Sequence, residues 1–436
     1  MKVGFVSLGC SKNLVDTEMM IGLLKNNKFE IVNDETQADI LIINTCGFIE
    51  SAKQEAIDTI LEMAKYKEIG NCKYLVATGC LVQRYKKDLE KLLPEVDLFI
   101  SIDEYDEFWE KIEKMLNMNK KYDSDKLDYL DRIITTGNTT AYLKIAEGCS
   151  NFCTYCAIPY IRGKYISRKY EDIIKEANQL AKKGIKEIII IAQDTTKYGI
   201  DIYGKPRLHE LIKDISKIER IKWVRFLYAY PESITEELIN EVKANEKVCK
   251  YFDIPIQHIS DNILKKMNRK STGKDIKELV KKLRNEIPDV ILRTSLIVGF
   301  PGETEDEFIE LLDLVKETKF DKLGVFMYSK EEGTPAAKFT NQVHYKTKQS
   351  RWNKIMKEQN IISANILNKK IGRKYIALIE GITQEKSYYI ARTYMDVPDM
   401  DGLIFIKNDQ NHNIGDFVNC KVSSVKEYDL IGEIID

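Results

Sequence analysis

The sequence predicts an α/β protein built from three folded parts. Short apolar runs alternate with helical patterns over residues 1–116, six further strand-and-helix repeats occupy 135–368, and short β-like runs with turn residues fill 369–436. These observations favour an N-terminal parallel α/β domain, a partial (β/α)6 barrel and a small antiparallel β-barrel of the OB type. Residues 117–134 are polar and charged, and we expect them to link the first two parts.

The N-terminal part contains four candidates for buried strands. Each is an apolar run, and a helical pattern separates it from the next, which predicts a parallel sheet covered by helices. The expected strands span residues 2–8, 40–45, 74–78 and 98–102, and the expected helices span 14–24, 52–65 and 89–93.

The middle part repeats strand and helix six times, which is too few for a complete eightfold barrel. In barrels of this kind the chemistry lies at the carboxyl ends of the strands. The expected strands are 141–146, 187–194, 223–229, 251–257, 291–300 and 322–328, and the expected helices are 170–183, 208–218, 235–246, 274–286 and 304–318. A further helix, 349–370, should join the barrel to the C-terminal part, where turn signals such as Asp401-Gly402 favour a small β-barrel.

Composition narrows the class of protein. Hydrophobic residues make up 44% and charged residues 31%, as in an ordinary globular protein, and the net charge of −1 provides no general basic field for nucleic acid. The longest apolar run, residues 188–192, is too short to span a membrane, and the segment before Cys10 is too short for a signal peptide. We therefore expect a cytoplasmic protein without a membrane partner. The nine cysteines are then expected to be reduced, without a disulfide framework.

The most specific motif is the trio Cys149, Cys153 and Cys156, which directly follows the first predicted barrel strand. Three thiolates within eight residues can hold a four-iron four-sulfur cluster and leave one iron open. S-adenosylmethionine (SAM) needs an open iron, because its amino and carboxylate groups chelate a metal. The alternative is a zinc site with a distant fourth ligand, since structural zinc normally takes four protein ligands.

Another trio, Cys10, Cys46 and Cys80, follows three successive predicted strands of the N-terminal sheet. Because parallel strands end at the same edge of a sheet, these thiols should meet and could hold a second cluster. Neighbouring glycines leave room for a bulky group. The alternative is that all three are small buried apolar residues, which is our expectation for the cysteines without such placement, Cys72, Cys249 and Cys420.

The Cys-x-x-x-Cys-x-x-Cys loop after the first strand of a partial barrel resembles the radical SAM superfamily. The resemblance implies that a reduced cluster cleaves SAM to methionine and a 5′-deoxyadenosyl radical, which abstracts a hydrogen atom. It also implies that Tyr155 contacts adenine, and that Gln193 and Asp194 bind the methionine end of SAM. Arg293 and Gly299 are further candidates for SAM contacts. For each of these, ordinary polarity at a strand end is the alternative reading.

Taken over essentially the whole chain, the three parts resemble the methylthiotransferases. This implies two 4Fe–4S clusters, with the second cluster carrying or passing on sulfur. One SAM would supply a methyl group and another the radical, so that C–S–CH3 replaces C–H. Sulfide or polysulfide is expected as the sulfur donor, and flavodoxin or ferredoxin as the electron donor.

Local sequence resembles the branch of that family that modifies a ribosomal protein, the RimO branch. The segments that carry the resemblance are GCSKNLVD (9–16), NTCGFI (44–49), AKQE (52–55), GCLVQRY (79–85), DIPIQH (253–258) and YSKEEGTP (328–335). The implied reaction is methylthiolation of the β-carbon of an aspartate in small-subunit ribosomal protein twelve, free or in the ribosome, to give 3-methylthioaspartate. Arg162, Lys164 and Arg168 are candidate cations for the substrate carboxylate. The alternative is that they bind nothing and cap the following helix region.

The C-terminal part resembles the TRAM domain, a module that often binds RNA. Residues 371–436 contain seven Lys and Arg against eleven Asp and Glu, a net charge of −4. An RNA-binding surface should be basic, so the acidic balance, including Asp396, Asp399 and Asp401 in one turn, favours a basic ribosomal protein as partner rather than tRNA. Solubility alone could also explain it. The alternatives are a tRNA methylthiotransferase acting on a hypermodified adenosine next to the anticodon, and a non-enzymatic iron–sulfur or zinc protein.

Overall fold

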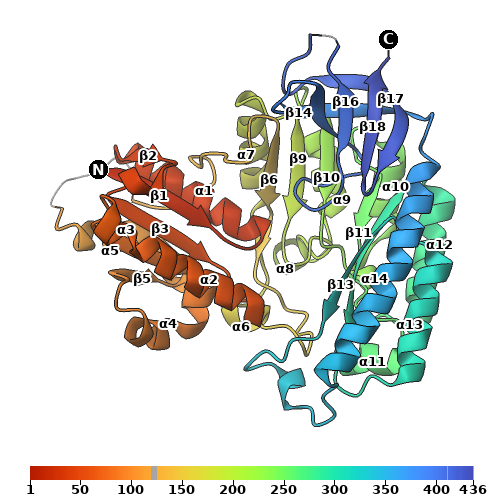
Figure 1. The fold of residues 1–436 in the computed structure, drawn as a ribbon, viewed down its shortest axis with the longest axis horizontal. Helices are drawn as coiled ribbons and strands as arrows, with labels where there is room; N and C mark the ends of the chain where they lie inside the picture. The colour runs from red at the N-terminus through yellow and green to blue at the C-terminus, as the bar shows by residue number, and fades with distance from the viewer. Residues whose placement is uncertain (119–124, 410, 436) are drawn as a thin grey trace.

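Five parallel strands form the N-terminal sheet of the computed structural model, which describes residues 1–118, 125–409 and 411–435 (Figure 1). The strand order is β2-β1-β3-β4-β5, and each predicted strand is present. The sequence did not indicate the edge strand β2 or helix α5, and it placed the start of α4 too late. The strands are β1 (Lys2–Ser7), β2 (Glu30–Val32), β3 (Ile40–Thr45), β4 (Tyr74–Gly79) and β5 (Leu98–Ile100). The helices are α1 (Ser11–Asn26), α2 (Glu50–Ala64), α3 (Tyr66–Ile69), α4 (Cys80–Leu92) and α5 (Phe108–Met115), with 3-10 turns at Glu35–Gln37 and Ile102–Glu107.

The barrel is a curved, open sheet of six parallel strands in two halves. The halves have the orders β10-β9-β6 and β11-β12-β13, and they meet where the Ala229 N–H donates to the Asp253 carbonyl at 2.8 Å. All six predicted strands are confirmed. They are β6 (Thr140–Lys144), β9 (Glu187–Ile191), β10 (Trp223–Phe226), β11 (Tyr251–Asp253), β12 (Ile291–Val298) and β13 (Lys322–Met327).

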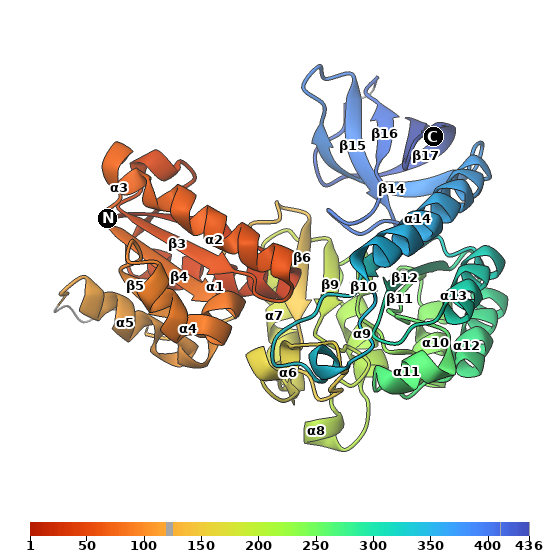
Figure 2. The same ribbon diagram turned by 60° about the horizontal axis from the view of Figure 1, so that its bottom comes forward.

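Helices cover the outer face of this sheet, as the six repeats predict, and their apolar sides form one core with the strands (Figure 2). The covering helices are α7 (Tyr170–Lys182), α9 (Leu208–Ser216), α10 (Glu236–Ala244), α12 (Gly273–Glu286), α13 (Glu305–Thr318) and α14 (Tyr345–Asn368). Shorter elements are β7 (Ala146–Glu147), α6 (Ile158–Ile161), β8 (Ile166–Ser167), α8 (Ile200–Tyr203), α11 (Asp261–Lys266) and 3-10 turns at Pro231–Ser233 and Pro335–Lys338. No helix in the described ranges combines the length and apolarity needed to cross a membrane.

The C-terminal strands close into a barrel of order β14-β15-β16-β18-β17. Four neighbouring pairs are antiparallel, as predicted, whereas β16 and β18 pair in parallel. β17 lies between β16 and β18 in the chain and runs antiparallel to β18, so β16 and β18 can run in the same direction. The strands are β14 (Lys374–Ile382), β15 (Tyr388–Thr393), β16 (Ile404–Lys407), β17 (Phe417–Lys426) and β18 (Asp429–Ile434).

The segment predicted as a linker, 117–134, is packed into the molecule where it is described, while residues 119–124 lie outside the described ranges. Arg132 is fully buried, with its guanidinium paired to Glu18 of α1 and, at 2.9 Å, to Glu176 of α7. One arginine thereby joins the N-terminal domain to the barrel.

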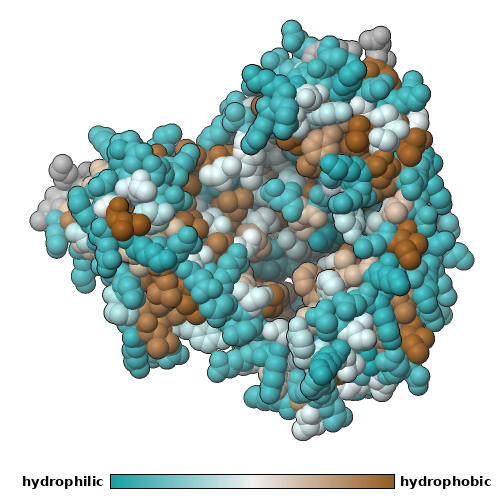
Figure 3. Space-filling view, in the orientation of Figure 1, coloured by the Kyte–Doolittle hydropathy of each residue, from teal (hydrophilic) through white to brown (hydrophobic). Residues whose placement is uncertain are grey.

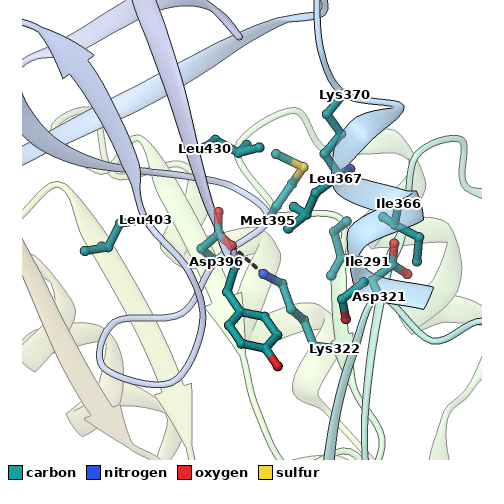
Figure 4. Close-up of a pocket in the computed structure, with 12 residues that line it drawn as sticks. Ile291, Asp321, Lys322, Ile366, Leu367, Lys370, Met395, Asp396, Leu403 and Leu430 are labelled. Atoms are coloured by element: carbon teal, nitrogen blue, oxygen red, sulfur yellow. Dashed lines mark hydrogen bonds and ion pairs between the residues drawn. The ribbon is translucent and has the colours of Figure 1, made fainter. Parts of the chain in front are cut away.

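The C-terminal barrel is attached through buried charges. Arg392 of β15 pairs with Glu187 of β9 at 2.6 Å, and Glu187 also pairs with Arg225 of β10 at 3.0 Å. Near this junction, Asp396 pairs with Lys322 at 2.7 Å in a pocket beside α14 (Figure 4). The expectation of an acidic docking turn therefore needs correction. Asp396 is buried in the junction, and Asp401 accepts a hydrogen bond from Tyr251 at 2.7 Å.

Candidate functional site

Cys10, Cys46 and Cys80, the first trio in chain order, lie at one edge of the N-terminal sheet, as their positions after strands predict. Cys10 follows β1 and caps α1, Cys46 follows β3, and Cys80 begins α4 directly after β4. These three strands are neighbours in the order β1-β3-β4. Gly9 has a φ of 88°, and a Cβ on it would come within 2.7 Å of the Cys46 Cβ, so only glycine allows this close approach.

Asn13 ties the loops of this edge together, a role that the sequence did not single out. Its side-chain N–H donates to the carbonyls of Leu8 and Thr45, both at 3.0 Å, and the Asn44 side chain donates back to the Asn13 carbonyl at 2.8 Å. The ends of β1 and β3 are therefore held in one place by buried hydrogen bonds, which fixes the positions of Cys10 and Cys46.

Two cations act on this trio. The Arg162 Nε donates to the Cys80 sulfur at 3.4 Å. Burial raises the pKa of the Cys80 thiol to about 12, against the opposing effect of Arg162. Burial alone would also raise the pKa of Cys10, but the charges of Lys12 and Arg162 bring it below its usual value. The two cations therefore favour the thiolate form of Cys10, whereas burial opposes ionisation of Cys46 and Cys80.

The second trio lies in the loop between β7 and α6. Cys149 and Cys153 are buried, and burial raises the pKa of Cys149 to about 11. The Cys149 N–H donates to the Gly163 carbonyl at 3.1 Å. Gly148, with a φ of 71°, packs so closely that a Cβ there would lie 2.1 Å from the Lys164 carbonyl oxygen. The loop thus depends on glycine for its turn.

Within the described ranges, no three His, Cys, Asp or Glu side chains converge closely enough to hold one metal ion. The ligands of a single zinc all lie within about 2.3 Å of the metal, whereas thiolates on a four-iron cluster bind separate irons. Thiolate is the ligand type that such clusters take. The donor type of both trios is therefore compatible with cluster binding.

Of the predicted SAM contacts, Asp194 lies beside the second trio. It is buried just after β9, where burial raises the pKa of its carboxyl group, and it accepts a hydrogen bond from the Asn151 side chain at 2.9 Å. Gln193 is its half-buried neighbour. Tyr155 packs against the aromatic cluster of Phe300 and Tyr328.

Arg293 and Gly299 lie on β12 and at its end. Arg293 pairs with Asp253 at 2.8 Å inside the barrel. Gly299 has a φ of 72°, and its N–H bonds to the Glu303 carboxylate. Each has a structural role of its own in the barrel, so the alternative of ordinary strand-end polarity stays open for both.

A buried ionic network joins the two trios. Arg162 pairs with Asp16 of α1 at 3.0 Å and with Glu147, just before the second trio, at 2.9 Å. Lys144 of β6 also pairs with Asp16, and with Glu147 at 2.9 Å. Burial would raise the pKa of Glu147, but Lys144 and Arg162 hold it well below its usual value. These ion pairs therefore connect β6, the first barrel strand, to helix α1 of the N-terminal domain.

This network changes the expectation for the substrate carboxylate. Arg162 is neutralised by Asp16 and Glu147, and Arg168 pairs with Glu176 at 2.6 Å. Lys164 is exposed. Two of the three candidate cations thus already bind carboxylates of the chain itself.

The N-terminal domain also contacts the far end of the barrel sheet. Arg84 of α4 pairs with Glu331, which follows β13, at 3.0 Å, and Glu331 is 2% exposed. The domain therefore spans the open side of the barrel, from β6 to the segment after β13. A space-filling view shows a hollow between the N-terminal domain and the rest of the molecule (Figure 3).

Comparison with known families supports this architecture. Residues 143–315 match the model of the radical SAM superfamily, 2–101 that of uncharacterized protein family UPF0004, and 371–435 that of the TRAM domain. Among solved structures, the radical SAM methyltransferase TsrM from Kitasatospora setae aligns with a TM-score of 0.56 at 14% identity, covering 77% of this chain and 76% of TsrM. The cobalamin-dependent SAM radical enzyme OxsB aligns with a TM-score of 0.51 at 14% identity, covering 83% and 56%. These two likenesses concern the fold alone.

Closer relatives match along the whole chain. A protein of Alkaliphilus oremlandii (strain OhILAs), named ribosomal protein uS12 methylthiotransferase RimO, is 62% identical over 100% of this chain and 99% of its own length. The protein of that name from Clostridium botulinum (strain Hall) is 55% identical over 99% and 98%, respectively. The chain therefore belongs to the RimO family of ribosomal protein uS12 methylthiotransferases, within the radical SAM superfamily.

Proposed function

We propose that this enzyme replaces a C–H bond on the β-carbon of an aspartate in ribosomal protein uS12 by C–S–CH3. The observation that carries the proposal is the presence of two cysteine trios, each at the carboxyl ends of strands, joined by the buried network around Arg162. One trio is sufficient for radical generation, whereas sulfur insertion calls for a second group. The names of the full-length relatives supply the substrate.

In this proposal Cys149, Cys153 and Cys156 hold the cluster that binds SAM, and the trio at the edge of the N-terminal sheet, Cys10, Cys46 and Cys80, holds the auxiliary cluster. When bound, the clusters and SAM supply the electron, the 5′-deoxyadenosyl radical, the sulfur and the methyl group. The proposed SAM contacts are Tyr155, Gln193, Asp194, Arg293 and Gly299.

The protein's own side chains position and screen these groups. Asn13 and Arg162 hold the edge that carries Cys10 and Cys80, and Arg162 donates to the Cys80 sulfur. The buried pairs of Lys144 with Asp16 and Glu147 exclude water between the trios. Radical chemistry needs such exclusion, since a reactive intermediate must not meet solvent.

The proposal also includes the sulfur and electron donors, the cellular location and the domain boundaries. Sulfide or polysulfide would be the sulfur donor and flavodoxin or ferredoxin the electron donor. A substrate on the ribosome, or free before assembly, would place the enzyme in the cytoplasm. The proposed domains are 1–116, 135–368 and 369–436, with 117–134 as a packed connection.

The test is anaerobic reconstitution with iron and sulfide, followed by SAM, reductant and either uS12 or unmodified tRNA. Mass spectrometry should show a methylthio group on one aspartate of uS12, and 5′-deoxyadenosine should form. The variants Cys46→Ala and Cys153→Ala should each abolish product, whereas Cys72→Ala, a buried cysteine outside both trios, should retain it. Modification of tRNA alone, or of neither substrate, would contradict the proposal.

A further inference from the structure

Lys12 is a buried cation that forms no ion pair with an Asp or Glu side chain in the described part of the chain. Its side chain is 4% exposed. Other buried cations at the same junction, Arg132, Lys144 and Arg162, each pair with at least two carboxylates. Leaving an ammonium group buried without an anion is costly. Within the described ranges, the acidic groups whose charge acts on Lys12 are the Cys10 thiol and the Tyr228 hydroxyl, so no carboxylate neutralises it and an anion from outside the chain can bind there.

The position of Lys12 connects the first trio to the barrel. It lies on the first turn of α1, two residues after Cys10, and its Nζ lies 3.5 Å from the ring centroid of Tyr228. Tyr228 follows β10, at the carboxyl edge of the barrel sheet where chemistry is expected. Lys12 therefore reaches from the proposed auxiliary cluster toward the barrel mouth.

The partner residue is itself held in an unusual conformation. Tyr228 has a φ of 61°, in the left-handed region, and its N–H donates to the Asp253 carboxylate at 3.0 Å. A bulky residue in this region is strained, and such strain concentrates at functional sites. Asp253 in turn binds Arg293 at 2.8 Å, so it is neutralised by a cation other than Lys12. The ring of Tyr228 is thereby presented beneath the ammonium group by a rigid support.

We propose that Lys12 binds the side-chain carboxylate of the substrate aspartate and thereby sets the preference for a protein over an RNA substrate. The inference rests on the proposed function and adds the residue that recognises the substrate. The β-carbon is one bond from the carboxylate, so a fixed carboxylate places the reacting carbon beside the trio of Cys10. A neutral adenine base would bring no carboxylate for the ammonium group to bind, which counts against it.

One other buried cation lacks a carboxylate partner in the described ranges. Arg269 has an unsatisfied Nη1 and stacks over Tyr230, 4.2 Å from the ring centroid. The Tyr230 hydroxyl lies 3.7 Å from the Cys153 sulfur, so Arg269 belongs to the side of the second trio. Lys12 is the cation on the side of the first trio, where sulfur would be transferred.

The experiment varies the charge of residue 12 on the enzyme and the charge of the target residue on uS12. Reconstituted wild-type enzyme, Lys12→Met and Lys12→Arg are titrated anaerobically with uS12 and with uS12 whose target aspartate is replaced by asparagine. We expect wild type to bind the aspartate form at least tenfold more tightly than the asparagine form. Lys12→Met should lose that preference, and Lys12→Arg should keep most of it. Lys182→Met, which removes an exposed cation at the end of the outer helix α7, should leave the preference unchanged.

Several results would overturn the role of Lys12. Equal weakening of both uS12 forms by Lys12→Met would indicate a purely structural role, and retention of the preference would exclude carboxylate binding. If Lys12→Met fails to retain its iron, the wild-type titration still tests the proposal. Equal affinity of the wild-type enzyme for the aspartate and asparagine forms of uS12 would refute carboxylate binding. Failure of wild type to bind or modify uS12 at all would instead refute the proposed function.

Discussion

Arg162 bonds to three separate segments of the chain at once. It donates to Cys80, pairs with Asp16 of α1 and pairs with Glu147 beside the second trio. It lies only a few residues after Cys156, so a single side chain relates both trios. A guanidinium suits this role because its five N–H donors point in fixed directions.

We expect Arg162→Gln to lower the midpoint potential of the auxiliary cluster. A positive charge and a hydrogen bond at a ligating sulfur both stabilise the reduced, more negative cluster, so their loss favours the oxidised form. Arg162→Lys keeps the charge and should lower the potential less. A redox titration followed by EPR measures the shift. Arg168→Gln is the matched control, because Arg168 pairs with Glu176 and donates to the Lys144 carbonyl. Equal potentials in wild type and Arg162→Gln would contradict the assignment.

Single residues differ in how far sequence can predict them. The convergence of Cys10, Cys46 and Cys80 could be predicted, because their positions after strands depend only on the order of apolar runs. The role of Arg162 could not, because its partner Asp16 is 146 positions away. The charge of a side chain is visible in sequence, but whether a distant carboxylate already neutralises it is not. Lys12 lies within the motif GCSKNLVD, but the sequence does not show that its charge is buried, so it could not be assigned a role.

At the scale of elements, the loop that carries the second trio depends on its glycine. Gly148→Ala should displace the loop, because the added Cβ would meet the Lys164 carbonyl at 2.1 Å and the φ of 71° is itself unfavourable. We expect the variant to retain iron at one cluster only, with SAM cleavage lost. Iron analysis and the yield of 5′-deoxyadenosine measure both effects.

Gly163 provides the control for this substitution. It also has a positive φ, 74°, but a Cβ there would meet nothing within 4 Å. Gly163→Ala should therefore cost only about 1 kcal/mol of backbone strain and leave both clusters in place. If the two variants lost iron equally, the close contact at Gly148 would not be the cause.

Elements whose side chains are more completely buried were predicted more accurately from the sequence. The four-isoleucine run of β9 is wholly buried and was easily recognised, whereas the edge strand β2 has an exposed Glu30 and only partly buried neighbours. Helix α4 begins nine residues before the predicted range. Its first turn buries Cys80, Leu81 and Val82 in succession, and a kink at Tyr85, with a φ of −135°, interrupts the helix before Leu89. A run of consecutive buried residues followed by a kink gives little helical periodicity in the sequence.

At the scale of the whole molecule, the N-terminal domain bridges the open side of the barrel. It is anchored through Asp16 and Glu18 near β6 and through Arg84 near the end of β13. A partial barrel leaves its strand ends accessible, so a domain placed across the opening can bring a second trio to the same site. The motifs GCLVQRY and YSKEEGTP, far apart in sequence, meet in this second anchor.

Arg392 contributes buried ion pairs to the attachment of the C-terminal barrel, and this contribution can be tested. Arg392→Met leaves Glu380 and part of Glu187 without a cation in a buried junction, so we expect a loss of about 3–5 kcal/mol. Arg373→Met removes the exposed pair with Asp289 across the same junction and should cost only about 0–1 kcal/mol. Limited proteolysis should release the C-terminal barrel faster in Arg392→Met alone, with a lower Tm. Equal behaviour of the two variants would show that the apolar contacts between Trp223 and Phe417, whose rings lie 4.9 Å apart, hold the domain instead.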